Sequence, residues 1–299
     1  MTSSEKAIEV ASLTKYYGKI KGIEKVNFSV NKGEIHGFLG PNGAGKTTTI
    51  RILVGLLKQT SGISKIFGIE SGTIQAKELI GYLPSDYELY RHYTVGEYLH
   101  YVAKLRGGAP LLDDLVSEFN VDMSRKTKEL SKGNRQKVNI VQALMHDPEL
   151  IIADEPTSGL DPLMQAVFDK TIRSFVKRGK TVFISSHILT EVQNTCDRVT
   201  VIKEGEIITS GFVEDLLKQV PKKALIKKSN GRSIEEIATV LNAKAEKESN
   251  GKIAIYFNYS TKEFAQKVSS LDYIDDFVIP EPNLEEYFLP LYQKKEALK

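Results

Sequence analysis

Apolar positions along the chain change period repeatedly, and this alternation predicts a layered α/β fold. Short, almost fully apolar runs predict buried strands at residues 80–83, 149–153, 181–185 and 198–202. Two segments between them, residues 162–179 and 188–196, carry apolar residues at helical spacing. Strands that alternate with helices are typical of a mixed, mainly parallel sheet that helices cover on both faces.

The first half of the chain departs from this alternation in two places. Residues 8–15, 25–30 and 34–39 read as successive strands with a turn at residues 31–33, and predict an antiparallel β portion at the N-terminus. A glycine-rich loop and a helix over residues 48–57 follow. Three segments then carry helical spacing with no strand between them: residues 94–106, 111–120 and 133–146. They predict a helical insertion spanning about residues 84–146.

The last 88 residues form a separate pattern, because recognisable motifs stop near residue 212. Strands are expected at residues 224–229, 251–258 and 274–280, and helices at 233–241, 260–271 and 283–292. This order suggests a small α+β domain of ferredoxin-like type. Gly211 and Pro221 mark the boundary, so we expect one domain over residues 1–211 and an accessory domain over residues 212–299.

Composition narrows the class of protein. The chain has 299 residues and a formal net charge of +3, which is too small to imply a nucleic-acid partner. Its single cysteine, Cys196, cannot form an internal disulfide, which fits a reducing compartment. No stretch approaches the roughly 18 consecutive apolar residues of a membrane span, so a role at a membrane is expected to need a partner.

The strongest chemical motif follows the strand at residues 34–39. It runs Gly40, Pro41, Asn42, Gly43, Ala44, Gly45, Lys46, Thr47 and Thr48, and matches the P-loop pattern of nucleotide-binding proteins. Its glycines let backbone N–H groups surround phosphates. Lys46 is expected to reach the β- and γ-phosphates of the nucleotide, and the Thr47 hydroxyl to ligate Mg²⁺. A chance glycine-rich turn is the weaker alternative, because both the strand and the helix are in place.

A second motif, LIIADEP, is an apolar strand that ends in two acids. Asp154 is expected to hold Mg²⁺ directly or through water. Glu155 is placed to orient or deprotonate a water that attacks the γ-phosphate. Acidic strand ends are often merely solvated, but the P-loop in the same chain favours the catalytic interpretation.

A third motif, LSKGNRQK at residues 130–137, precedes a helix and by itself reads as an ordinary helix cap at Ser131. In the order P-loop, helical block, Leu-Ser-x-Gly and Asp-Glu strand, however, the sequence resembles the ATP-binding cassette family over roughly residues 8–210. The family signature LSGGQ is matched by Leu130, Ser131, Lys132, Gly133 and Asn134, with lysine and asparagine as departures. The resemblance implies a head-to-tail dimer, in which the signature of one chain closes over ATP on the P-loop of the other.

The resemblance carries over further positions. Tyr17 matches the aromatic residue that stacks on adenine, and the alternative is an aromatic residue of the core. Asp161 matches the loop that links the two nucleotide sites. His187 matches the histidine that contacts the γ-phosphate. Where the family usually has a glutamine that touches Mg²⁺ or the attacking water, this chain has Ser85 and Asp86. Two alternatives are open: Ser85 or Asp86 substitutes through water, or the contact is missing. This departure puts in doubt the link between the ATP state and the helical block.

The resemblance implies an ATPase with ATP and Mg²⁺ as cofactors. We expect it to energise a separate integral membrane permease, of the drug or antibiotic exporter type, from the cytoplasmic face of the membrane. The partners are then the permease and a second cassette chain, identical or related, without nucleic acid. The tyrosine-rich segment at residues 87–102 either packs within the helical block or docks the membrane subunit. The alternative functions are a cassette ATPase acting on ribosome or DNA, and a nucleotide-gated module without hydrolysis.

Overall fold

The computed structural model describes residues 5–228, 233–247 and 252–288. The chain divides into two compact units, Met1–Phe212 and Val213–Lys299. Within the described residues, no helix combines the length and the apolar character that crossing a bilayer requires.

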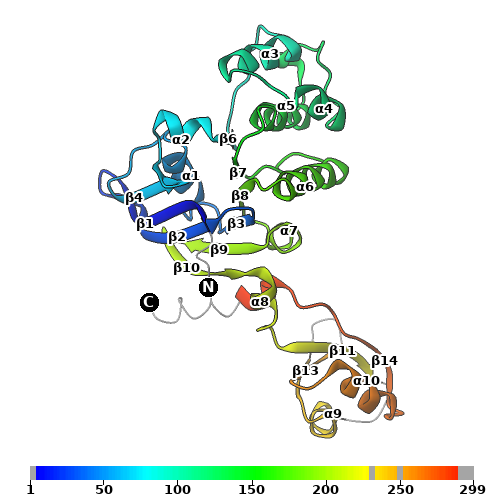
Figure 1. The fold of residues 1–299 in the computed structure, drawn as a ribbon. Helices are drawn as coiled ribbons and strands as arrows, with labels where there is room; N and C mark the ends of the chain where they lie inside the picture. The colour runs from blue at the N-terminus through cyan, green and yellow to red at the C-terminus, as the bar shows by residue number, and fades with distance from the viewer. Residues whose placement is uncertain (1–4, 229–232, 248–251, 289–299) are drawn as a thin grey trace. The chain divides into compact units, whose positions relative to one another are not determined.

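The centre of the first unit is a six-stranded sheet in the order β10-β9-β3-β8-β7-β6 (Figure 1). Its strands are β3 (Ile35–Leu39), β6 (Ile80–Leu83), β7 (Leu150–Asp154), β8 (Thr181–Ser186), β9 (Arg198–Lys203) and β10 (Glu206–Phe212). Five strands run parallel and β10 pairs antiparallel with β9 at one edge. Every residue of β3, β7 and β8 is buried, which explains why apolar residues predominate in these strands. The predicted mixed, mainly parallel sheet is therefore confirmed.

A second, antiparallel sheet has the order β2-β1-β4-β5. It comprises β1 (Lys6–Tyr17), β2 (Ile20–Asn31), β4 (Ser61–Ile66) and β5 (Ile69–Glu70). The predicted antiparallel β portion is confirmed for residues 8–15 and 25–30, whereas the strand expected at residues 34–39 is β3 of the parallel sheet. Strands β4 and β5 were not predicted. Only Ser64 and Ile66 of β4 are buried, so this strand is held mainly by backbone pairing with β1 and carries no clear apolar alternation.

Helices cover both faces of the parallel sheet. Those of the first unit are α1 (Lys46–Leu53), α2 (Ile74–Glu78), α3 (Val95–Leu105), α4 (Leu112–Glu118), α5 (Lys132–Leu144), α6 (Pro162–Lys177) and α7 (Leu189–Thr195), with a short 3₁₀ turn at Thr127–Glu129. Residues Ile50 and Leu53 of α1 join one core with both sheets, while α6 and α7 pack against β8 on the other face. The helical insertion is confirmed: α3, α4 and α5 lie together in Figure 1.

The second unit is a four-stranded antiparallel sheet with helices. It contains α8 (Val213–Leu217), β11 (Lys222–Lys228), α9 (Ile234–Leu241), β12 (Lys244–Lys247), β13 (Ile253–Phe257), α10 (Thr261–Ser269) and β14 (Ile274–Val278). The strand order is β12-β13-β11-β14, and from β11 onward the element order is β-α-β-β-α-β. The polar strand β12, with sequence KAEK, was not predicted. Residues 284–288 are helical, whereas residues 289–292 of the expected helix lie outside the described residues.

Candidate functional site

Three parallel strands end at one edge of the six-stranded sheet, and the loops that follow them carry the predicted chemistry. The P-loop follows β3, Glu155 follows β7, and His187 follows β8. In the register of the sheet, Leu39 lies opposite Ser186 and Asp154 lies opposite Ser185. Parallel pairing therefore brings together side chains that are more than 100 residues apart in the sequence.

The P-loop adopts a conformation that depends on its glycines. Gly43 and Gly45 have φ angles of +78° and +106°, a region that side-chain-bearing residues rarely adopt. Gly40 lies so close to β9 that a Cβ there would come within 2.3 Å of the Ile202 carbonyl oxygen. Pro41, Asn42 and Gly43 are exposed at the tip of the loop. The loop thus leads into the N-terminus of α1, where free N–H groups and the helix dipole favour an anion.

Lys46 is the cation at the centre of this loop. Its side chain is buried, and Nζ donates hydrogen bonds to the carbonyl oxygens of Gly40 at 2.7 Å and Pro41 at 3.2 Å. The same Nζ lies 3.5 Å from Glu155 Oε1. The ammonium group is therefore held between the loop backbone and one of the two predicted acids, where phosphate oxygens can replace these partners.

Asp154 is the most enclosed charged group of the site, with a relative exposure of 1%. Three hydroxyl groups donate to its carboxylate: Thr47 Oγ1 at 2.8 Å and Ser85 Oγ at 2.9 Å to Oδ2, and Ser185 Oγ at 2.5 Å to Oδ1. These donors come from α1, from the loop after β6 and from β8. The structure thus brings Thr47, Ser85 and Asp154 together, and the exposed Asp86 makes no hydrogen bond to Asp154 among the described residues.

Glu155 has a φ of +52°, in the sparsely populated left-handed region. Its N–H lies 3.1 Å from Ser185 Oγ and 3.2 Å from the Ser185 carbonyl oxygen, contacts that hold this conformation. The carboxylate is 24% exposed, and its Oε1 lies 3.1 Å from His187 Nδ1. The turn therefore directs the second acid away from the buried Asp154 and toward His187 and Lys46.

Tyr17 lies at the end of β1, close to the P-loop helix. It is 47% exposed, its hydroxyl is 3.4 Å from Thr48 Oγ1, and its ring packs against Gly22. Lys15 Nζ lies 5.3 Å from the centre of the ring. A half-exposed ring in this place is not a core residue, so the alternative of a buried strand aromatic is wrong.

The signature residues form the N-terminus of α5. The Ser131 hydroxyl caps the helix by accepting from the Asn134 N–H at 3.3 Å. Lys132 Nζ reaches Ser158 Oγ at 3.4 Å, and a Cβ on Gly133 would come within 2.9 Å of the Gly159 carbonyl oxygen. The signature therefore packs against the loop that follows Glu155. In the described part of the chain, no hydrogen bond or ion pair joins it to the P-loop.

Asp161 has a structural place at the start of α6. Its Oδ1 accepts from the Met164 N–H at 3.0 Å, with Pro162 as the next residue, so it is the N-cap of the helix. It begins α6 directly after the loop that carries Ser158 and Gly159.

Sequence reasoning missed several polar residues of the site. Ser185 holds Asp154, and the buried Gln136 donates to the Pro156 carbonyl oxygen at 2.6 Å while accepting from the Tyr87 hydroxyl at 3.0 Å. Glu191 accepts from the hydroxyls of Thr157 and Ser186. A signal existed for Ser185, a polar residue near the end of an apolar strand. Gln136 and Glu191 look like ordinary helix residues in the sequence.

The chain is similar to several known proteins. The model of the family described as "ABC transporter" matches residues 23–158. An uncharacterized ABC transporter ATP-binding protein of Methanocaldococcus jannaschii is 37% identical over 80% of this chain and 92% of its own length. The bacitracin transport ATP-binding protein BcrA of Bacillus licheniformis is 42% identical over 67% of this chain and 68% of its own.

A solved structure, an ATP binding subunit of an ABC transporter, has a TM-score of 0.67 and 31% identity, covering 71% of this chain and 92% of that one. Two further uncharacterized relatives, from Nostoc and Synechocystis, are matched over only 62% and 59% of their own length.

Proposed function

Because this chain belongs to the ATP-binding cassette transporter family, as an ATP-binding subunit, we propose that it hydrolyses ATP to drive a separate membrane-embedded transporter. One observation carries the proposal: Lys46, Asp154, Glu155 and His187 meet at one edge of the parallel sheet. A transport role is favoured over action on ribosome or DNA, because the similar protein BcrA is named for bacitracin transport.

ATP is proposed to bind across the P-loop and the end of β1. Its phosphates accept hydrogen bonds from the backbone N–H groups of residues 43–48 and from Lys46, which exchanges its carbonyl partners for phosphate oxygens. Tyr17 offers an exposed ring for the adenine base, and the Thr48 hydroxyl lies beside it. Aromatic stacking is tolerant of the base, so the affinity comes mainly from the phosphates.

The hydroxyl and carboxylate oxygens at Asp154 fit Mg²⁺. Thr47 Oγ1 and Asp154 Oδ2 are hard oxygen donors 2.8 Å apart, and Ser85 Oγ shares the same carboxylate oxygen. When bound, Mg²⁺ neutralises charge on the phosphate oxygens. Thr47 and Asp154 are the proposed ligands, and Ser85 takes the place of the family's glutamine by orienting Asp154. Ser185 holds the other oxygen of the carboxylate and so fixes its direction.

Glu155 and His187 are the proposed catalytic residues. Glu155 orients the attacking water and accepts its proton, and His187 donates a hydrogen bond to the γ-phosphate. Lys46 Nζ lies near Glu155 Oε1 at 3.5 Å, which places the water-activating group beside the phosphate-binding group.

The test of the proposed activity is Glu155→Gln in the full-length chain. The variant should bind ATP as the original protein does, while hydrolysis falls at least about 100-fold, because an amide cannot accept the proton. ATPase rates and equilibrium binding of ATP give the two readouts. Unchanged turnover in the variant would refute the role of Glu155, and no turnover in the original protein would refute the proposed activity.

The signature residues are proposed to act on the nucleotide of a second chain. Ser131, Lys132, Gly133 and Asn134 lie at the N-terminus of a 13-residue helix, whose first backbone N–H groups lack partners within the helix. Among the described residues, no hydrogen bond or ion pair joins them to the P-loop of their own chain. A partner's γ-phosphate fits this anion-binding end, and Asp161 holds the loop that connects the two sites.

Disulfide trapping tests the head-to-tail dimer, and the chain suits it because it has a single, buried cysteine. With Asn42→Cys and Ser131→Cys in the Glu155→Gln background, ATP and a mild oxidant should give covalent dimers on a non-reducing gel. The two single-cysteine variants are the controls. Covalent dimers without ATP dependence, or none with ATP, would contradict the arrangement.

The membrane subunit is proposed to dock on the helical block. Tyr90, Tyr93 and Tyr101 form an exposed cluster with ring centres 6.0 to 6.1 Å apart, and Leu105 is 69% exposed on the same helix as Tyr101. Aromatic side chains gathered at a surface are typical of interfaces. We propose an exporter partner and attachment at the cytoplasmic face. Membrane recruitment by a co-expressed permease, lost on Tyr90→Ser/Tyr93→Ser, would test this docking.

A further inference from the structure

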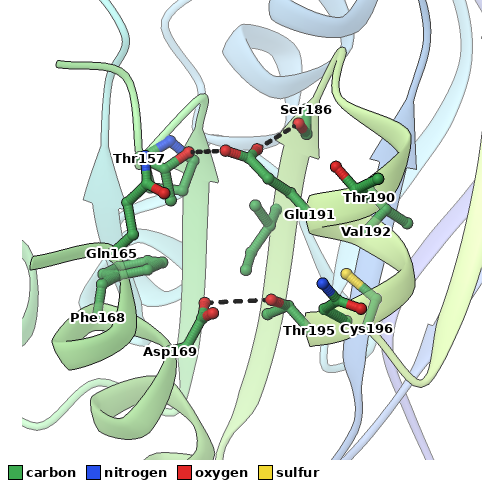
Figure 2. A pocket seen from close by; sticks show the side chains of 13 residues that line it. Thr157, Gln165, Phe168, Asp169, Ser186, Thr190, Glu191, Val192, Thr195 and Cys196 are labelled. Atoms are coloured by element: carbon green, nitrogen blue, oxygen red, sulfur yellow. Dashed lines mark hydrogen bonds between the residues drawn. The ribbon is translucent and has the colours of Figure 1, made fainter. Parts of the chain in front are cut away.

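A cavity of about 230 Å³ lies beside the candidate site, between α6, α7 and β8 (Figure 2). Two carboxylates line it, Glu191 from α7 and Asp169 from α6. Each is hydrogen-bonded across the cavity, but to different parts of the molecule. Asp169 Oδ1 accepts from the Thr195 hydroxyl at 3.1 Å and so links α6 to α7.

Glu191 makes the connection that reaches the site. Thr157 Oγ1 donates to its Oε1 at 2.9 Å, and Ser186 Oγ donates to its Oε2 at 2.8 Å, as the dashed lines in Figure 2 show. Thr157 lies two residues after Glu155, and Ser186 immediately precedes His187. One carboxylate therefore bridges the loop after β7, close to Glu155, and the last residue of β8, directly before His187.

We infer that Glu191 is a positioning residue, which fixes the turn carrying Glu155 relative to the strand end carrying His187. The inference rests on the proposed function. A carboxylate only accepts hydrogen bonds, and each of its oxygens here holds one hydroxyl donor, so the two donors are kept at a fixed separation.

The catalytic pair needs such a support. His187 is 44% exposed, and an exposed contact at 3.1 Å to Glu155 contributes little rigidity by itself. Glu155 also occupies a left-handed backbone conformation, which persists only where neighbouring contacts enforce it. A displacement of about 1 Å between catalytic groups can cost about 100-fold in rate.

A simpler role for Glu191 exists, because an acid in the first turn of a helix stabilises the helix dipole. This role would change only the stability of α7. The positioning role instead predicts an effect on turnover that depends on the hydrogen bonds to Thr157 and Ser186.

The experiment measures ATPase kinetics and ATP binding of full-length variants. Glu191→Ala should lower kcat about 10- to 100-fold and leave the KM and Kd for ATP within about twofold, because the P-loop is untouched. Glu191→Gln should recover most of the rate: the amide oxygen accepts from one hydroxyl, and the amide nitrogen donates to the other.

Thr195→Val is the matched control. The substitution removes the Thr195 hydroxyl, which donates to the Asp169 carboxylate across the same cavity. Thr195 lies on the same helix as Glu191, yet this hydrogen bond involves neither strand end. It should leave kcat within about twofold. Thr157→Val/Ser186→Ala should reproduce the loss seen in Glu191→Ala, and adding Glu191→Ala to that pair should lower kcat no further.

The positioning role is overturned if Glu191→Ala lowers kcat no more than Thr195→Val, if the loss appears in KM instead, or if Glu191→Gln is as slow as Glu191→Ala. An original protein that hydrolyses no ATP would instead count against the proposed function, so the two failures are distinguishable.

Discussion

Two glycines of the P-loop provide a direct test of its geometry, because the same substitution meets different surroundings at each. Gly43 and Gly45 both have positive φ, at +78° and +106°. A Cβ added at Gly43 meets nothing within 4 Å, whereas one at Gly45 comes within 2.5 Å of Cγ2 of the buried Ile23 and 3.2 Å of the Gly22 carbonyl oxygen. Alanine is the smallest probe of this difference.

The expected costs follow from these contacts. A left-handed conformation costs an L-residue about 1–2 kcal/mol, so Gly43→Ala should destabilise by about that amount. Gly45→Ala adds overpacking against a side chain that cannot move into solvent, about 1–3 kcal/mol more. Both variants also reduce the entropy of the unfolded chain, which offsets about 0.4–1 kcal/mol in each and therefore cancels in the comparison.

Thermal unfolding without nucleotide is the assay. For a unit of this size, 1 kcal/mol corresponds to about 2–4 °C in Tm, so the Tm of Gly45→Ala should lie roughly 2–12 °C below that of Gly43→Ala. Equal shifts, or a larger shift for Gly43→Ala, would refute the assignment of the Ile23 contact. Leaving nucleotide out is essential, because a Cβ at the exposed tip can meet a bound phosphate.

Three further outcomes are expected. Tyr87→Phe removes the hydroxyl that donates to the side-chain oxygen of the buried Gln136, whose amide donates to the Pro156 carbonyl oxygen, and it should lower kcat several-fold. Tyr98→Phe removes a tyrosine hydroxyl from Gln142 of the same helix and should cost similar stability, about 1–3 kcal/mol, without lowering kcat. Comparable rates in both variants would contradict a link between the Tyr87–Gln136 contact and catalysis. Burial raises the pKa of the Cys196 thiol, so thiol-specific reagents at pH 8 should label the native protein far more slowly than the denatured chain, as absorbance or mass spectrometry would show. Burial lowers the pKa of His36, so at mildly acidic pH the unfolded chain binds a proton at this residue that the folded chain does not bind. The free energy of unfolding should therefore fall as the pH drops below about 6.5. Urea titrations at several pH values should show a steeper fall for the original protein than for His36→Gln.

The segments that the sequence specified best are those whose chemistry is contiguous. The run from Gly40 to Thr48 needs a fixed order of residues to surround phosphates, and the structure folds it as a loop entering α1. The strand that ends in Asp154 and Glu155 is buried on both faces, so its apolar run could be recognised without knowing its neighbours. The helix after Ser131 carried both its cap and its apolar spacing in the sequence.

The missed strands share a physical cause. The strands β4, β5, β10 and β12 are short or half-exposed and lie near sheet edges, where backbone pairing with a neighbour defines the strand. Side-chain alternation is weak in such strands. Their existence follows from the strand beside them, which the local sequence does not encode.

The sequence by itself identified the candidate nucleotide-binding loop and the two candidate acids, because each motif is a local arrangement of backbone and side chain. Only the tertiary structure decided their partners: Ser85 and Ser185 on Asp154, and Glu191 between Thr157 and Ser186. Those contacts depend on strand register and on the packing of α7 against β8. Three of the four join residues that are 31 to 69 positions apart in the sequence, whereas Ser186 and Glu191 are only five apart. Long-range pairing of this kind leaves no spacing that can be recognised along the chain.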